Sequence, residues 1–167
     1  MKCSLTMRLI FVSILLSCND AREDSPEFIN TDKEEINKLL ENYKKSINEI
    51  DTTLAKSFWL TDSRVSFIHP RGHEKGWEGI KTGIYKMFKD RFTKRDLKSY
   101  DETITIFGDM AVLEFYWIFD ATFSGENPAD MQTKGRETQV LKKIDGQWRI
   151  VHIHYSGMPA TGELEGF

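Results

Sequence analysis

The chain has 167 residues, with 23 basic and 26 acidic side chains and a formal charge of −3 at pH 7. This slightly acidic balance, without a block of basic residues, argues against nucleic acid as a partner. The length suits one domain with its own core, and no internal repeat divides the sequence.

The N-terminus has the pattern of a secretory signal. A basic lead, Lys2 and Arg8, precedes an apolar run at 9–16 that is shorter than the roughly 20 residues of a membrane span. Leu15-Leu-Ser-Cys18 then resembles a bacterial lipobox, which implies cleavage before Cys18 and lipid on its thiol; ordinary secretion is the alternative. We expect a lipoprotein signal peptide at 1–17, a tether at 18–30, and a lipid-anchored protein of the cell envelope, on its periplasmic or surface side.

The next part of the chain predicts helices. Thr31-x-x-Glu34 forms a capping box, and apolar residues at helical spacing predict a helix over 32–50. A short helix follows Asp51-Thr52, and a third runs from about Trp77 to Phe92. Between them we expect a strand at 64–68 and a loop at 69–76.

The C-terminal half predicts strands. Residues 100–107 alternate, residues 111–123 are almost wholly apolar, and two further strands at 132–144 and 147–155 flank Asp145-Gly146, a strong hairpin signal. Three helices followed by an antiparallel sheet predict an α+β fold, in a domain spanning 31–160 with a tail at 161–167.

This order of elements resembles the nuclear transport factor 2-like superfamily, in its SnoaL-like branch. The C-terminal part is also similar to the association domain of calcium/calmodulin-dependent kinase II. The matching runs are Glu137-Thr138, Asp145-Gly146-x-Trp148 and Val151-His152-x-His154-x-Ser156-Gly157-x-Pro159. The resemblance implies a cone in which three N-terminal helices pack in a curved antiparallel sheet, with a pocket between them.

The resemblance also places a candidate ligand pocket. In the association domain, arginines line the pocket at the positions that match Trp117, Gln139 and Tyr155, and none of these is arginine here. An aromatic and amide lining suits an unknown neutral or aromatic small molecule, although large aromatics also simply fill cores. By alternation the same face carries Leu113, Phe115, Phe119 and Ile153, and Trp59 and Trp77 are expected at the mouth.

Two residues are candidates for catalysis. Glu137 shares the pocket face, where a buried carboxylate needs either a function or a partner such as Arg149 or Arg136. His69 ends the first strand near the pocket mouth, where it is either a general base or a hydrogen-bonded loop residue. The resemblance to SnoaL-like cyclases and ketosteroid isomerases implies acid/base chemistry in this pocket.

The opposite face of the sheet predicts self-association. Its members share an apolar convex surface of the kind that is often an interface, so we expect a homodimer. His152-x-His154 has a spacing that can hold a metal, but no third ligand is evident and we expect none. The register stays open, because a two-residue and a three-residue turn at Asp145-Gly146 pair the strands differently; the resemblance implies the three-residue turn or a bulge. The expected interface residues are Tyr116, Val140, Trp148, Ile150, His152 and His154.

Three functions remain open. The first is that of a lipoprotein domain that binds a small molecule. The second is that of an enzyme of the ketosteroid-isomerase or polyketide-cyclase type acting on an apolar substrate, and the third is that of an oligomerisation module with a vestigial pocket. We expect the first, without a cofactor and with no contact to the membrane except through the lipid on Cys18.

Overall fold

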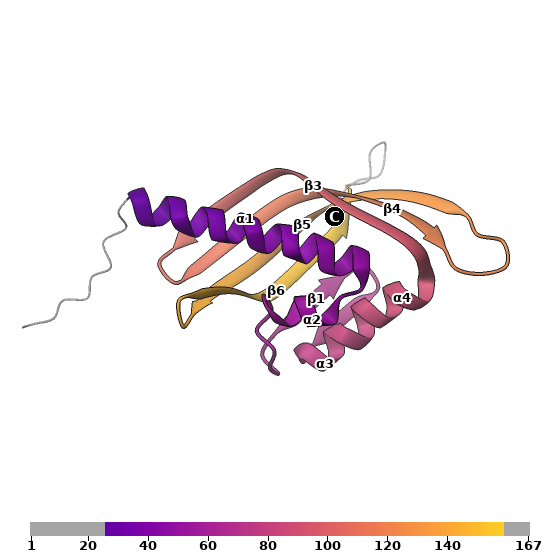
Figure 1. The fold of residues 1–167 in the computed structure, drawn as a ribbon, viewed down its shortest axis with the longest axis horizontal. Coiled ribbons are helices and arrows are strands. Elements are labelled where there is room, and N and C mark those ends of the chain that lie inside the picture. Colours follow the sequence, from indigo (N-terminus) through magenta and orange to yellow (C-terminus); the bar gives the residue numbers. More distant parts are fainter. Residues whose placement is uncertain (1–25, 159–167) are drawn as a thin grey trace, which may run out of the picture.

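The computed structural model describes residues 26–158 (Figure 1). The expected signal peptide at 1–17, Cys18 and the whole tail at 161–167 lie outside the described residues. Among the residues described, no helix combines the length and the apolar character that crossing a membrane requires.

The long first helix, α1 (Pro26–Glu49), lies across the sheet. Its buried side chains recur at the predicted helical spacing: Ile36, Leu39, Leu40, Tyr43 and Ile47. The expected start at Thr31 is wrong, since this residue lies inside the helix. The described part of the helix begins at Pro26 and includes the last residues of the expected tether.

Two further helical stretches cover the sheet. The short α2 (Thr52–Lys56) is capped by Asp51, whose carboxylate accepts hydrogen bonds from the backbone N–H of Thr53 and Leu54 at 2.9 and 2.8 Å. The second stretch is continuous and consists of α3 (Gly76–Ile80), a π-helical turn (Lys81–Lys86) and α4 (Met87–Arg91). It ends one residue before the expected Phe92, which opens the next strand.

The sheet has six strands in the order β2-β1-β6-β5-β4-β3, and all neighbours are antiparallel except β1 and β6. The expected loop at 69–76 is wrong, because His69 pairs with Gly72 in a tight hairpin. The strand expected at 100–107 begins at Phe92; its charged first half is typical of an exposed edge strand. The strands are β1 (Ser66–His69), β2 (Gly72–Lys75), β3 (Phe92–Phe107), β4 (Met110–Phe123), β5 (Asp130–Ile144) and β6 (Gln147–Gly157).

The turn between β5 and β6 has two residues. Ile144 pairs with Gln147, and Asp145 and Gly146 both have positive φ angles, of 50° and 77°. Two successive positive φ angles define the type I′ turn, whose twist matches that of the flanking strands. The hairpin therefore begins in the register of a two-residue turn, which is one of the two registers that the sequence left open.

A β-bulge then changes the register. Leu141 pairs with Ile150 but Val140 pairs with His152, so Val151 is an extra residue on β6. An extra residue shifts the strand by one position, so odd-numbered and even-numbered side chains exchange faces beyond it. Trp148 and Ile150 consequently lie on the inner, helix-facing side, with 5% and 0% of their surfaces exposed. The expectation that both belong to the convex interface is wrong.

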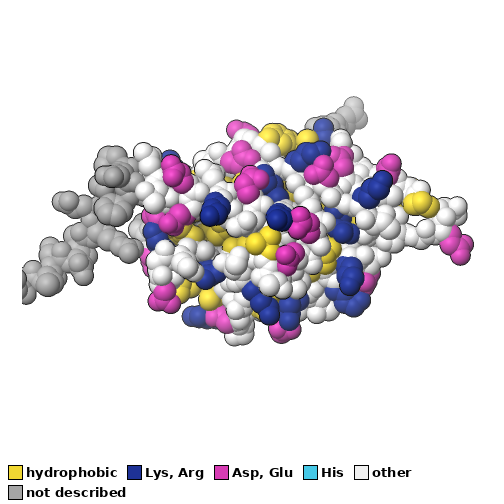
Figure 2. Space-filling model, viewed as in Figure 1, with side chains coloured by type: hydrophobic (Ala, Val, Ile, Leu, Met, Phe, Trp, Pro, Cys, Tyr) yellow, Lys and Arg dark blue, Asp and Glu magenta, His cyan; other side chains and the backbone are white. Residues whose placement is uncertain are grey.

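The core lies between the helices and the inner face of the sheet, and the surface is charged. Figure 2 shows acidic and basic side chains interspersed over the side of the molecule where α1 lies. The β4–β5 hairpin extends beyond the helices at one end (Figure 1).

Candidate functional site

A cavity of about 350 Å³ lies between the helices and the inner face of β4, β5 and β6. Its wall is largely aromatic and aliphatic, because α1, α4 and three strands each turn an apolar face toward it. A volume in this range suits a small molecule. The apolar wall includes Ile47, Phe67, Met87, Phe88, Phe92 and Phe119.

A buried carboxyl group belongs to this wall. Glu137 of β5 is 4% exposed, and its two oxygens accept hydrogen bonds from Gln139 Nε2 at 2.7 Å and from the Tyr43 hydroxyl at 3.3 Å. Burial raises the pKa of Glu137 to about 7, although both hydrogen bonds act in the opposite direction. Near neutral pH the group can therefore either hold or accept a proton.

The partners of Glu137 differ from those considered from the sequence. Arg149 bonds the Ser57 carbonyl and Gln147, and Arg136 donates to Ser156 Oγ at 3.4 Å. Both arginines therefore have other partners, and the carboxyl group is held by uncharged donors. No cation among these contacts holds the carboxyl in its ionised form.

Two aromatic rings meet beside the carboxyl group. Trp117 and Tyr155 lie edge to face with centroids 5.7 Å apart, and both line the cavity. The Trp117 ring has room because its cross-strand neighbour is Gly135, where a Cβ atom would overlap the indole. The Trp117 indole N–H has no hydrogen-bond partner among the described residues, so it is a donor that a ligand could use.

His69 lies behind this wall. Its ring stacks on Tyr155 with centroids 6.0 Å apart, and its Nε2 lies 3.4 Å from Glu74 Oε1. Within residues 26–158 no hydrogen bond joins His69 to Glu137, and His69 is not among the residues that line the cavity. The structure thus places one of the two catalytic candidates in the cavity and the other one layer away.

The remaining predicted pocket residues divide into three groups. Phe119 lines the cavity with Trp117 and Tyr155. Trp59 and Trp77 pack on each other at 6.4 Å in the core, because Trp59 is bridged to Ile150, several residues from Tyr155 along β6. Four others are on the inner face but buried away from the cavity: Leu113, Phe115, Gln139 and Ile153.

Sequence reasoning missed several residues of the cavity. Tyr43 appeared only as one apolar position of a helix, yet its hydroxyl reaches Glu137. Arg71, in the β1–β2 turn, and Arg91, at the end of α4, both line the cavity. Lys134 of β5 lines the cavity as well, so its positive charge comes from a strand, a turn and a helix, and no spacing in the sequence connects the turn and the helix to β5.

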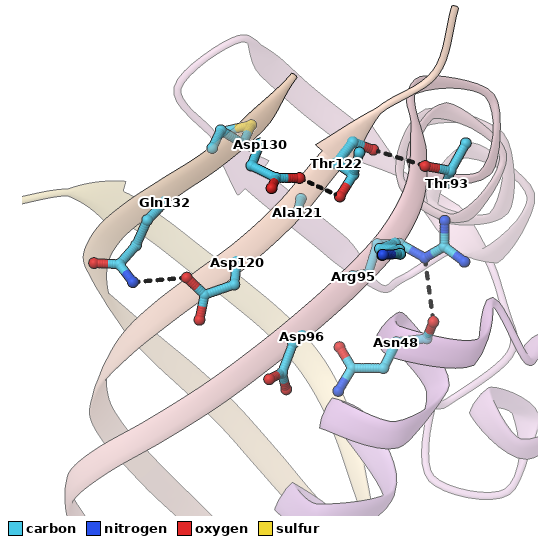
Figure 3. Close-up of a pocket in the computed structure, with 11 residues that line it drawn as sticks. Asn48, Thr93, Arg95, Asp96, Asp120, Ala121, Thr122, Asp130 and Gln132 are labelled. Carbon is cyan, nitrogen blue, oxygen red and sulfur yellow. Dashed lines mark hydrogen bonds between the residues drawn. The ribbon is translucent and has the colours of Figure 1, made fainter. Parts of the chain in front are cut away.

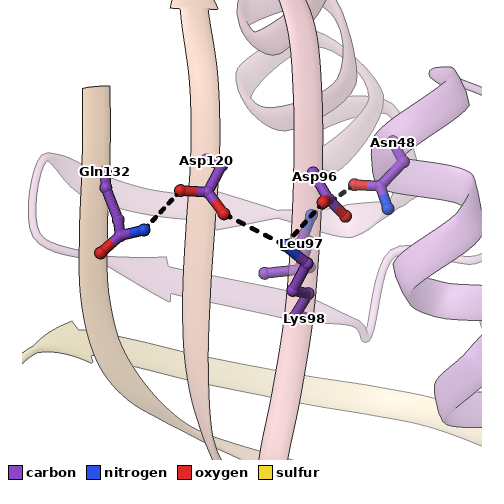
Figure 4. A network of polar contacts seen from close by, with 6 residues as sticks. All are labelled: Asn48, Asp96, Leu97, Lys98, Asp120 and Gln132. Carbon is purple, nitrogen blue, oxygen red and sulfur yellow. Dashed lines mark hydrogen bonds and ion pairs between the residues drawn. The ribbon is translucent and has the colours of Figure 1, made fainter. Parts of the chain in front are cut away.

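A larger, more open groove of about 760 Å³ lies beside the ends of β3, β4 and β5 (Figure 3). Its polar groups already bind one another. Thr122 donates to Asp130 at 2.6 Å, and Gln132 donates to Asp120 at 2.6 Å. Lys98 lies 2.8 Å from Asp96 and 3.2 Å from Asp120 (Figure 4). This exposed, internally paired surface offers less for a ligand than the cavity does.

The expected interface histidines lie on the outer face. His152 Nδ1 is 2.7 Å from Ser66 Oγ, and His154 is exposed. Burial lowers the pKa of His152, and the neighbouring His154 and His73 contribute in the same direction. In the described part of the chain, no three His, Cys, Asp or Glu side chains are grouped as metal ligands.

The curved sheet, the helices across its inner face and the cavity between them define the class of this protein. It is an α+β fold with a ligand-sized cavity between its two layers. A family model described as the SnoaL-like domain matches residues 36–161, and the chain belongs to this family. A nuclear transport factor 2-like superfamily protein from Salmonella enterica serovar Typhimurium is 42% identical, with 83% of this chain and 99% of that chain covered and a TM-score of 0.79.

More distant structures share the fold. One is a protein provisionally named scytalone dehydratase from Novosphingobium aromaticivorans, at 14% identity, 81% and 89% coverage and a TM-score of 0.71. Another is LinA, at 13% identity, 76% and 86% coverage and a TM-score of 0.69. Comparison with curated protein sequences gives no match.

Proposed function

We propose that this domain binds a small, largely apolar molecule in the cavity between its helices and the inner face of the sheet. The observation that carries the proposal is the cavity itself, of about 350 Å³, with an aromatic wall and a single buried carboxyl group at Glu137. An apolar pocket with a few converging polar groups is the usual form of a small-molecule site. A vestigial pocket in an assembly module would more simply be filled by side chains.

The proposal is tested by ligand-induced stabilisation. A neutral aromatic probe such as indole should raise the melting temperature by mass action in the wild type. Trp117→Ala, in the wall, should change this response, while Tyr116→Ala, its neighbour on the outer face, should leave it intact. An equal response of both variants, or no response in the wild type, would contradict binding in this cavity.

A second candidate function is proton transfer, which the near-neutral pKa of Glu137 favours. A base is most effective when its pKa lies close to the working pH, and burial gives Glu137 such a value. In this function the ionised carboxyl group would take a proton from a carbon beside a carbonyl group.

This function is tested by isotope exchange. NMR would follow the loss of α-protons of β-tetralone in deuterated water with the wild type and with Glu137→Gln. Exchange that depends on Glu137 would establish the acid/base role. Equal rates for the two proteins, with binding retained, would leave a binding domain without this chemistry.

The outer face of the sheet is proposed to pair with a second copy. Tyr100 is 42% exposed and stacks on Tyr116 at 5.5 Å, while Val140 is half-buried and His152 and His154 lie on the same face. Light scattering of the domain should show a dimer, and Tyr116→Glu should dissociate it. A Lys89→Glu variant, on exposed α4, serves as control. A monomeric wild type contradicts the pairing.

The envelope location is a proposal based on the lipobox-like sequence that ends at Cys18. Labelled fatty acid should be incorporated into the wild type and not into Cys18→Ser, and the variant should leave the membrane fraction. If both proteins stay in the membrane fraction and the wild type takes up no label, the lipid anchor is contradicted.

A further inference from the structure

The cavity wall carries positive charge from three elements, of which β5, with Lys134, is one. Arg71 and Arg91 both line it, from the β1–β2 turn and from the end of α4. Both side chains are exposed, and within the described chain neither guanidinium has a carboxylate partner. The Arg91 guanidinium instead lies over Phe92 and Phe123, at 5.6 and 5.4 Å from their ring centroids.

The interior end of the cavity has the opposite character. Glu137 is the one acidic residue among the described residues that line it, and it is buried. An anionic group placed beside this carboxyl would be repelled whenever the carboxyl is ionised and would have no cation to pair with there. A ligand anion is therefore favoured only at the arginine end.

Tyr155 connects the two ends electrostatically. Burial raises the pKa of its hydroxyl to about 12, the charge of Glu137 acts in the same direction, and Arg71 and Arg91 act in the opposite direction. The charges of the carboxyl group and of the two arginines therefore all act on the hydroxyl of Tyr155. A single small molecule that contacts Tyr155 can reach toward both.

We propose that the ligand is an amphipathic organic anion, with an aromatic or aliphatic body in the cavity and a carboxylate or similar group held by Arg71 and Arg91. This inference rests on the proposed small-molecule function and gives its ligand a chemical class and an orientation. Arginine binds planar anions through its fixed fork of N–H donors. The apolar end then faces Trp117 and Glu137.

Two matched probes test the inference: 4-phenylbutyrate and its uncharged amide, titrated calorimetrically into the domain. The carboxylate should bind about tenfold more tightly, and the difference should shrink as salt is added. Arg71→Gln combined with Arg91→Gln should abolish the preference for the carboxylate and lower the affinity for the amide far less. Lys89→Gln, an exposed cation on α4 outside the cavity wall, should change neither.

The outcomes separate the inference from the function on which it rests. Equal affinities of the two probes for the wild type, or a preference that survives the double substitution, would overturn the anion site and leave the cavity as a binding site. Failure of both probes to bind would overturn the binding function and the inference with it. Because both arginines are exposed, the double variant should fold, and its melting temperature without ligand checks this.

Discussion

The inner and outer faces of the sheet differ in how tightly their residues are held. On the inner face, Trp117, Glu137 and Tyr155 converge on a cavity and are held by contacts from α1 and β1. On the outer face, their immediate neighbours contact other strands of the sheet: Tyr116 stacks on Tyr100 of β3, and Ser156 accepts a hydrogen bond from Arg136 of β5. The same strands thus supply both a constrained site and a tolerant surface, and helix cover distinguishes them.

The difference teaches where substitutions should matter. Inner residues are fixed by close packing from two sides, so a change of one atom or of register is felt. Outer residues have free space on one side in the protomer. The following predictions sharpen this contrast, from the largest expected effect to the smallest.

Deleting Val151 should have the largest effect. Without the bulge residue, the alternation of β6 continues unbroken, and Ile153 and Tyr155 would turn to the outer face or displace Trp148 and Ile150. Each buried side chain lost from the core costs about 2 kcal/mol or more, so cooperative urea unfolding should be lost. Deleting Glu126, in the exposed β4–β5 loop, should leave a cooperative transition. Similar curves for both deletions would contradict the role of the bulge.

Two paired glycines give a sharper test. Gly135 and Gly157 are cross-strand partners, but a Cβ atom at Gly135 would overlap both Trp117 and the Ser156 carbonyl, while one at Gly157 would meet nothing. Gly135→Ala should lower the free energy of unfolding by at least about 3 kcal/mol, since the backbone cannot yield easily. Gly157→Ala should change it by under about 1 kcal/mol. Urea denaturation measures both, and equal losses would contradict the close fit of the Trp117 ring against Gly135.

The pH dependence of stability should follow Glu137. Its carboxyl has a pKa of about 7 when folded and near 4.5 when unfolded, so between these values the native state binds the extra proton. Stability should therefore fall as pH rises from about 5 to about 8, by up to about 3 kcal/mol. Glu137→Gln should flatten this dependence, and Glu114→Gln, on the outer face, should retain it. An unchanged slope in Glu137→Gln would contradict the raised pKa.

The smallest effect is expected for Tyr116→Thr. In dilute monomer the change removes one stacked contact with Tyr100 and should lower the free energy of unfolding by about 1 kcal/mol or less. The measurement needs two protein concentrations, because a loss that grows with concentration would indicate the proposed second copy. A large loss in dilute monomer would mean that the outer face is as constrained as the inner one.

Local signals predicted most of the elements. The helical spacing of Ile36, Tyr43 and Ile47, and the turn at Asp145-Gly146, each depend on neighbours within a few residues. The α+β fold and the SnoaL-like family followed from those elements and the matching runs. The charged first half of β3 was missed because edge strands need not alternate in hydrophobicity.

The site depended on information that no single segment contains. Alternation placed Trp117, Glu137 and Tyr155 on one face, but whether that face encloses a cavity depends on how far α1 and α4 stand from the sheet. The bulge at Val151 separated Trp148 and Ile150 from His152, and a bulge leaves little trace in composition. The sequence by itself determined the strands, the turn and the family, because these rest on local pattern. Only the tertiary structure brought Arg71, Arg91 and Tyr43 to the cavity that Glu137 lines, because residues from a turn and two helices meet there only once the chain is packed.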